Sequence, residues 1–221
     1  MSEAIPSRER PAKLLETATA SEHSELQIIS RCIEEASLAL KMYFVRLQHG
    51  LPENEEEAAI RRALFRDGLI QIMACFSTNP NKRDRYLIPS EAFDGQQGWE
   101  PFYKWMLDLR DGYAAHNFGA QRLADSIVFL DSDTGQVAGV GIITVGFDGP
   151  SEGEASFSAF CGTAMRHAKS RMEQASAKLL AEAQALSKAE LEALHDAALV
   201  VPGAEDVKTS REKYRTKTKG S

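Results

Sequence analysis

The sequence has little cysteine and no long hydrophobic run, and both shortages exclude whole classes of protein. Its 221 residues include three cysteines, Cys32, Cys75 and Cys161. Three scattered cysteines do not make a disulfide framework, so we expect reduced thiols buried on apolar helix faces. The apolar runs, such as the four residues 127–130, are far shorter than the ~18–20 residues of a membrane span. Residues 1–25 lack the apolar centre of a secretory signal, so we expect no membrane association and a cytoplasmic location.

Several motifs that carry common chemistries are also missing. The chain has no glycine loop ending in Lys-Ser or Lys-Thr, no Gly-x-Ser-x-Gly, no Cys-x-x-Cys and no His-Glu-x-x-His. Glu192 and His195 have the spacing of two metal ligands on one helix face, but a di-iron bundle needs two such pairs and two further glutamates. We therefore expect neither a metal nor another cofactor.

What the chain does have is the composition of a globular protein with an uneven charge. Hydrophobic residues make up 43% of it and the formal net charge is −6. Residues 204–221 read as a disordered basic tail, whose Lys and Arg side chains could grip RNA phosphates or an acidic partner, or simply be solvated. The rest of the chain is acidic, which argues against scanning of nucleic acid by a basic face.

Apolar spacing predicts two helices in the first half of the domain. From residue 25 to residue 48 apolar residues recur every three or four positions, which indicates an amphipathic helix. Glycine and proline then interrupt the pattern, and the carboxylates of residues 53–57 favour the start of a second helix that ends near residue 76. Two long helices joined by so short a connection should lie antiparallel.

The second half mixes helix with strand. Residues 77–98 show no sustained period and predict a long loop with room for one turn of helix, and residues 99–116 resume helical spacing with both tryptophans. Residues rich in Val, Ile and Thr on either side of a turn predict a β-hairpin at about 126–147. A long helix is expected from 153 to about 186, and Ser187 begins a capping-box pattern that predicts a shorter helix after it. The fold class is therefore mainly α, with a flexible leader at 1–23 and one domain at 24–203.

One short stretch at the end of the 99–116 helix carries a recognisable pattern. It contains Arg110, Asp111, Tyr113, Ala115 and His116, in the sequence Arg-Asp-Gly-Tyr-Ala-Ala-His. This resembles the Arg-x(4–6)-His motif of the HEPN superfamily. The element order is also similar to that family, and the hairpin resembles its abortive-infection-type members. The resemblance implies a HEPN-like up-and-down helical bundle with an inserted β-hairpin.

The resemblance also implies a function. Many family members with an intact motif are metal-independent endoribonucleases of toxin or phage-defence type. In this chain Arg110 and His116 would be catalytic and Asp111 would orient one of them, while Tyr113 and Asn117 would contact the RNA substrate. An antitoxin or a small nucleotidyltransferase would be the expected partner. Other members are not nucleases, so the alternative is a non-catalytic module that binds nucleotides or proteins.

The geometry of the motif sets a condition on any joint role for Arg110 and His116. On a regular helix the two residues lie about 120° apart around the axis and ~9 Å apart along it. Gly112 is costly within a helix and could mark a distortion, or a second copy of the motif could face the first across a symmetric homodimer, which we expect to involve residues 99–116. A purely structural alternative is also open, in which Tyr113 and His116 pack together at the helix end.

Overall fold

The structure is a computed structural model and describes residues 13–195 except 51, 53, 116–121, 133 and 147–148. The chain divides into two compact units. The larger unit is Ala18–Leu179, and the smaller one combines the described residues before Ala18 with those after Leu179. Within the described residues the protein is mainly helical and carries one two-stranded antiparallel sheet, as the sequence predicts.

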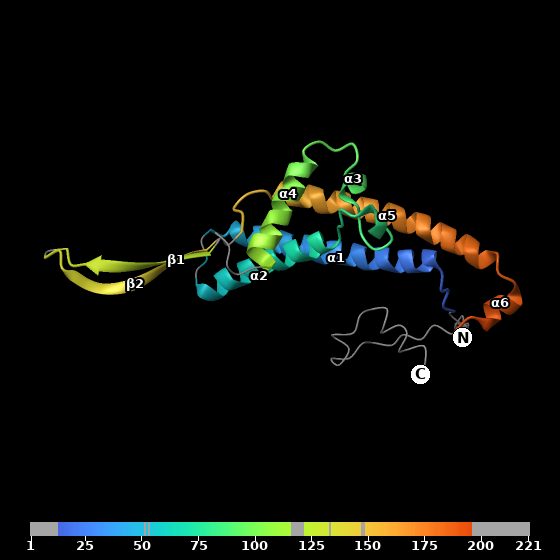
Figure 1. The fold of residues 1–221 in the computed structure, drawn as a ribbon, viewed down its shortest axis with the longest axis horizontal. Helices are drawn as coiled ribbons and strands as arrows, with labels where there is room; N and C mark the ends of the chain where they lie inside the picture. The colour runs from blue at the N-terminus through green and yellow to red at the C-terminus, as the bar shows by residue number, and fades with distance from the viewer. Residues whose placement is uncertain are drawn as a thin grey trace, which may run out of the picture. The chain divides into compact units, whose positions relative to one another are not determined.

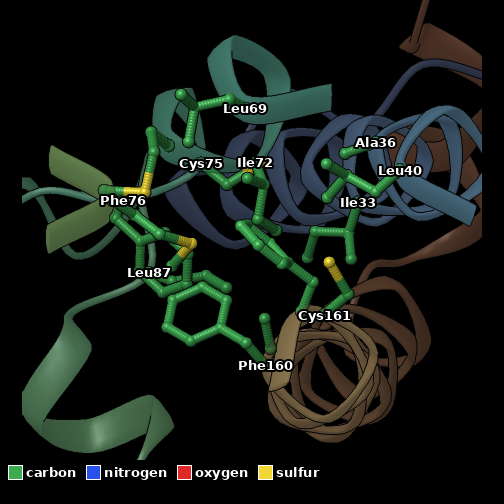
Figure 2. Close-up of a cluster of buried hydrophobic side chains, with 14 of the residues drawn as sticks. Ile33, Ala36, Leu40, Leu69, Ile72, Cys75, Phe76, Leu87, Phe160 and Cys161 are labelled. Carbon is green, nitrogen blue, oxygen red and sulfur yellow. The ribbon is translucent and has the colours of Figure 1, made fainter. Parts of the chain in front are cut away.

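The first two helices are antiparallel partners. Helix α1 spans Ala18–Leu47 and helix α2 spans Glu55–Ala74 (Figure 1). Asn54 caps α2, because its side chain accepts a hydrogen bond of 2.9 Å from the backbone N–H of Glu57. Their apolar faces pack together with residues of the last long helix, as Figure 2 shows for Ile33, Ala36, Leu40, Leu69, Ile72 and Cys161.

A compact connection links α2 to the next long helix. It contains the short 3₁₀ helix η1, Pro80–Lys82, and the one-turn helix α3, Pro89–Ala92. Helix α4 then spans Trp99–Leu109 and continues directly into the π-helix η2, Arg110–Ala115. The sequence predicts one helix over 99–116 and, for 77–98, a long loop with room for one turn of helix, whereas the structure has two short turns in that loop and a change to π-helix at Arg110. The sequence does not locate η1 and α3, because helices of three and four residues are too short to show an apolar period and Pro89 marks only a helix start.

The β-hairpin follows the π-helix. Strand β1 spans Arg122–Leu130 and strand β2 spans Val137–Gly146. They pair antiparallel, with Val128 opposite Val140, and the register shifts between Phe129 and Leu130. The prediction of a hairpin at about 126–147 is confirmed, although β1 begins four residues earlier than expected.

The last long helix, α5, spans Glu154–Gln184 and lies along α1 within the larger unit (Figure 1). Arg171 of α5 links the two helices, because it donates a hydrogen bond of 2.7 Å to Glu22 of α1. It also donates a hydrogen bond of 3.1 Å to the carbonyl of Tyr86, in the connection between α2 and α4. Ser187 and Glu190 form the predicted capping box at the start of helix α6, Lys188–Ala193.

Helix α1 begins earlier than the sequence pattern suggests. The periodic apolar residues start at Leu26, whereas the helix takes in Ala18 and the buried Thr19, so it includes the last residues of the stretch predicted as a leader. Small and polar residues carry no period, which is why the pattern misses this turn.

Aromatic side chains hold the larger unit together. Phe160 of α5 lies at the centre, with its ring centroid 4.4 Å from that of Phe93 and 5.6 Å from that of Phe76. Phe102 and Tyr103 of α4 contact the same ring at 5.7 Å and 6.5 Å. The cluster therefore joins the end of α2, the connection, α4 and α5.

The three cysteines are free, as expected from their spacing. Cys75 and Cys161 are buried and Cys32 is half-buried. Burial raises the pKa of the Cys75 thiol and of the Cys161 thiol to about 12 each, so both stay protonated and unreactive at neutral pH.

The close approach of α1 and α2 depends on Gly68. A Cβ at this position would lie 2.7 Å from Cγ of Leu40 and 3.1 Å from the carbonyl oxygen of Ala36. Although alanine has the higher helix propensity by ~1 kcal/mol, we expect Gly68→Ala to destabilise the protein by ~1–3 kcal/mol through overpacking. Urea denaturation followed by circular dichroism measures this change.

Gly162 of α5 provides the matched control. A Cβ there would meet only Nη1 of Arg166, at 3.6 Å, so Gly162→Ala should stabilise the protein by ~0.5–1 kcal/mol. If both substitutions stabilise the protein equally, the claim that the close approach of α1 and α2 requires a glycine at position 68 is wrong.

Candidate functional site

The predicted motif begins where the helix changes type. Leu109 is the last residue of α4, and Arg110 is the first residue of the π-helix. Gly112 lies inside this wider turn, so the distortion expected from a glycine within the motif is present. A π-helical turn moves each later residue to a new angle around the axis, and such turns occur frequently at functional sites.

Arg110 and Asp111 form a close ion pair on this turn. Nε of Arg110 donates to Oδ1 of Asp111 at 2.8 Å, and Nη2 lies 2.7 Å from the same oxygen. The side chain of Arg110 is 32% exposed and that of Asp111 is 57% exposed. An ion pair this open to water contributes little to stability, so its main effect is to orient the guanidinium group.

Beneath Arg110 the helix is anchored in the aromatic cluster. Tyr103 lies seven residues earlier on the same face of α4 and is buried. Burial raises the pKa of its hydroxyl, and the charge of Arg110 acts in the opposite direction. The ring centroid of Tyr103 lies 5.7 Å from that of Phe76 and 6.2 Å from that of Trp99. Sequence reasoning did not connect Tyr103 with the motif, although the seven-residue spacing was a signal for it.

Of the other three predicted site residues, only Tyr113 belongs to the described part of the chain. The backbone of Tyr113 belongs to the π-helix. His116 and Asn117 lie outside the described residues. The structure thus brings Arg110 and Asp111 together, while the positions of the other predicted residues relative to that pair stay predictions.

A second candidate site, which sequence reasoning missed, is a groove between the end of α1 and the start of α2. It has a volume of about 740 Å³. Leu38, Met42 and Val45 line one wall, and all three are exposed although they follow helical spacing. Lys41 and His49 add basic groups to the lining. The spacing of the three apolar residues, off the core face of α1, was the signal that could have indicated this surface.

The end of the groove nearest the α1–α2 turn is built by ion pairs. Arg61 is buried and donates to Oε1 of Glu57 at 2.9 Å and to the carbonyl of Gly50 at 2.6 Å. Arg46 pairs with the other oxygen of Glu57. The hydrogen bond from Arg61 holds the pKa of the Glu57 carboxyl below its usual range. These ion pairs fix Arg46, Glu57 and Arg61 relative to one another at this end of the groove.

Comparison with family models, with curated proteins and with solved structures gives no match for this chain. Among the described helices, none combines the length and the hydropathy that crossing a membrane requires. Function must therefore be inferred from the two sites themselves.

The pairing of Arg61 with Glu57 makes stability depend on pH in a defined direction. We expect Arg61→Met to lower the melting temperature by about 3–6 °C at pH 7, because the Gly50 carbonyl and Glu57 both lose their buried donor. The pKa of Glu57 is lower in the folded state than in the unfolded state. The contribution of the Glu57 carboxylate to the free energy of unfolding is therefore complete above its unfolded pKa, and it is lost as pH falls through its folded pKa.

The difference in melting temperature between wild type and Arg61→Met should therefore narrow as pH falls below 4.5, the ordinary pKa of a glutamate, and through the lowered pKa of Glu57, as measured by thermal unfolding. Arg66, an exposed arginine of the same helix, is the control, and Arg66→Met should change the melting temperature little at any pH. A difference for Arg61→Met that stays constant from pH 7 to pH 3 would contradict the pairing.

Proposed function

We propose that the protein is a metal-independent endoribonuclease of toxin or phage-defence type, acting through Arg110, Asp111 and His116 in the cytoplasm. The observation that carries the proposal is the Arg110–Asp111 pair at the first residues of a π-helical turn. The motif supplies an anion-binding group and a titratable base within seven residues, and the local helix departs from regular geometry at that point.

The chemistry requires no group beyond these side chains and the RNA itself. The 2′-oxygen of the ribose attacks the adjacent phosphorus, and the bond from phosphorus to the 5′-oxygen breaks. One proton leaves the 2′-hydroxyl and one proton is added to the departing 5′-oxygen. The products are a 2′,3′-cyclic phosphate and a 5′-hydroxyl. A histidine with a pKa near 6.5 can transfer either proton at neutral pH.

Arg110 and Asp111 have separate parts in this proposal. The guanidinium group offers a planar set of donors to the phosphate oxygens, whose negative charge grows during the attack. Asp111 holds the guanidinium through Nε and Nη2, so that the group is oriented before RNA binds. The partial exposure of Arg110 leaves it accessible to a phosphate.

Single-stranded RNA is the substrate that suits this site. Unpaired loops expose both the phosphate and a 2′-hydroxyl that can take the in-line position, whereas a duplex holds them in a fixed geometry. Tyr113 and Asn117 are the proposed substrate contacts, and the basic tail at 204–221 is a proposed source of phosphate contacts. A ribonuclease acting on cellular RNA needs restraint, so an antitoxin or a small nucleotidyltransferase is the proposed partner.

A second candidate function is supported by the groove between α1 and α2. Its apolar wall and preformed ion pairs suit a non-catalytic module that binds a nucleotide or a protein segment. In that case the motif would be structural, and its residues would contribute to stability and not to turnover.

Substitution of the motif separates the two functions. We expect Arg110→Ala and His116→Ala each to reduce RNA cleavage by at least ~100-fold, the usual scale for loss of acid–base or charge-stabilising help. The melting temperature should change by less than about 2 °C for Arg110→Ala, because its ion pair is exposed. Cleavage of total RNA in EDTA, measured beside thermal unfolding, tests both statements.

The matched control is Arg31→Ala. Arg31 also pairs with a carboxylate, Glu35, at 2.9 Å, but it lies on the exposed surface of α1. This variant should cleave RNA as the wild type does. A wild-type protein that is folded and inert toward RNA, with motif variants that melt several degrees lower, would favour the binding module.

A further inference from the structure

The groove between the end of α1 and the start of α2 has one apolar wall. Leu38, Met42 and Val45 form this wall, and their spacings of four and three place them on one face of α1. The wall covers two turns of helix, a length of ~10 Å. All three side chains are exposed, and Ile60 of α2 adds a fourth apolar residue to the lining. An exposed apolar surface inside a groove is typical of a binding site.

Charged side chains at both ends of the apolar wall limit the size of what it binds. One turn before the wall, Arg31 and Glu35 form an ion pair on the surface of α1. Directly after the wall, Arg46 pairs with Glu57. A stable protein–protein interface covers ~800 Å² on each partner, which two turns of one helix do not supply. The groove volume of about 740 Å³ lies instead within the range of small-molecule sites.

The charge of the groove selects an anion. Among the described residues that line it, three are cationic and two are carboxylates, namely Lys41, Arg46, Arg61, Glu56 and Glu57. The lining therefore carries one excess positive charge, although the chain as a whole carries −6. Arg46 and Arg61 share the single carboxylate of Glu57, so positive charge is in excess within this cluster. A positive site on an acidic protein attracts an anion and repels a cation.

We propose that the groove binds a medium-chain carboxylate, with its alkyl chain along the apolar wall and its carboxylate beside Arg46. The side chain of Arg46 is 34% exposed, so the guanidinium is accessible from the groove. Among the described residues, Arg46 uses Nη1 to pair with Glu57, and a guanidinium group has five N–H donors. Its planar shape matches the two oxygens of a carboxylate. Lys41 adds a second cation to the same lining.

The test is isothermal titration calorimetry of the whole chain with decanoate, below the concentration at which decanoate forms micelles. Decanoate has an extended alkyl chain about as long as the apolar wall, and we expect saturable binding at one site per chain. Acetate has the head group without the chain, and decyltrimethylammonium has the chain with the opposite charge. Each should bind at least ~10-fold more weakly than decanoate, because each lacks one of the two features that the groove recognises.

Two substitutions with matched controls locate the binding. Met42→Asp places a carboxylate in the apolar wall and should raise the dissociation constant of decanoate at least ~10-fold. Its control is Ile70→Asp on α2, because Ile70 is 40% exposed, close to the 43% of Met42, and lies outside the lining. Lys41→Glu reverses a lining charge and should raise the constant at least ~5-fold. Lys169→Glu reverses an exposed charge on α5, and both controls should change the constant by less than ~3-fold.

Several outcomes would overturn the proposal. The absence of saturable decanoate binding does so, and so does equal binding of decanoate and decyltrimethylammonium. Equal effects of Met42→Asp and Ile70→Asp would show general adsorption to apolar surface. Binding of AMP without binding of decanoate would assign the groove to a nucleotide. Circular dichroism checks that each variant is folded, and all four substituted side chains are exposed.

This inference goes beyond the ribonuclease proposal and does not rest on it. The groove and the motif share no residue among those that the structure describes. Met42→Asp should therefore cleave RNA as the wild type does, and Arg110→Ala should bind decanoate as the wild type does. Failure of either proposal is thus recognised without reference to the other.

Discussion

The packing of Phe160 is the interaction on which the larger unit depends. Its ring stacks on Phe93 at 4.4 Å and contacts aromatic residues from the end of α2 and from α4. Each aromatic pair adds ~0.5–1.5 kcal/mol beyond the burial of area, and several pairs share this one ring. The direction of α4, and with it the position of the motif at its end, is set by that cluster.

In this arrangement the buried part of α4 supports the helix, and the exposed residues after it present the charged groups. Tyr103 is held in the aromatic cluster, whereas Arg110 emerges two turns later with its guanidinium directed by Asp111. A group held by an exposed ion pair can exchange that partner for a phosphate at small cost, because water already screens the pair. A rigid support beneath an accessible cation is the arrangement that anion binding requires.

Much of the fold could be predicted from the sequence because its helices carry strong local signals. The apolar period of α1, the acidic first turn of α2 and the capping box at Ser187 each identify an element. The site was less predictable. Gly112 indicated a distortion but not a π-helix, since backbone type depends on packing as well as on propensity. The groove beside Met42 arises from two helix ends that meet in space, which no local pattern records.

The most direct test of the central claim is cleavage of a single-stranded RNA oligonucleotide compared with the same oligonucleotide lacking the 2′-hydroxyl at the scissile position. The proposed chemistry begins with attack by that oxygen and uses no metal. The account predicts that, in EDTA, the RNA is cut to leave a 2′,3′-cyclic phosphate and that the 2′-deoxy substrate stays intact. Equal cleavage of the two substrates, or a product with a free 3′-hydroxyl, would contradict it.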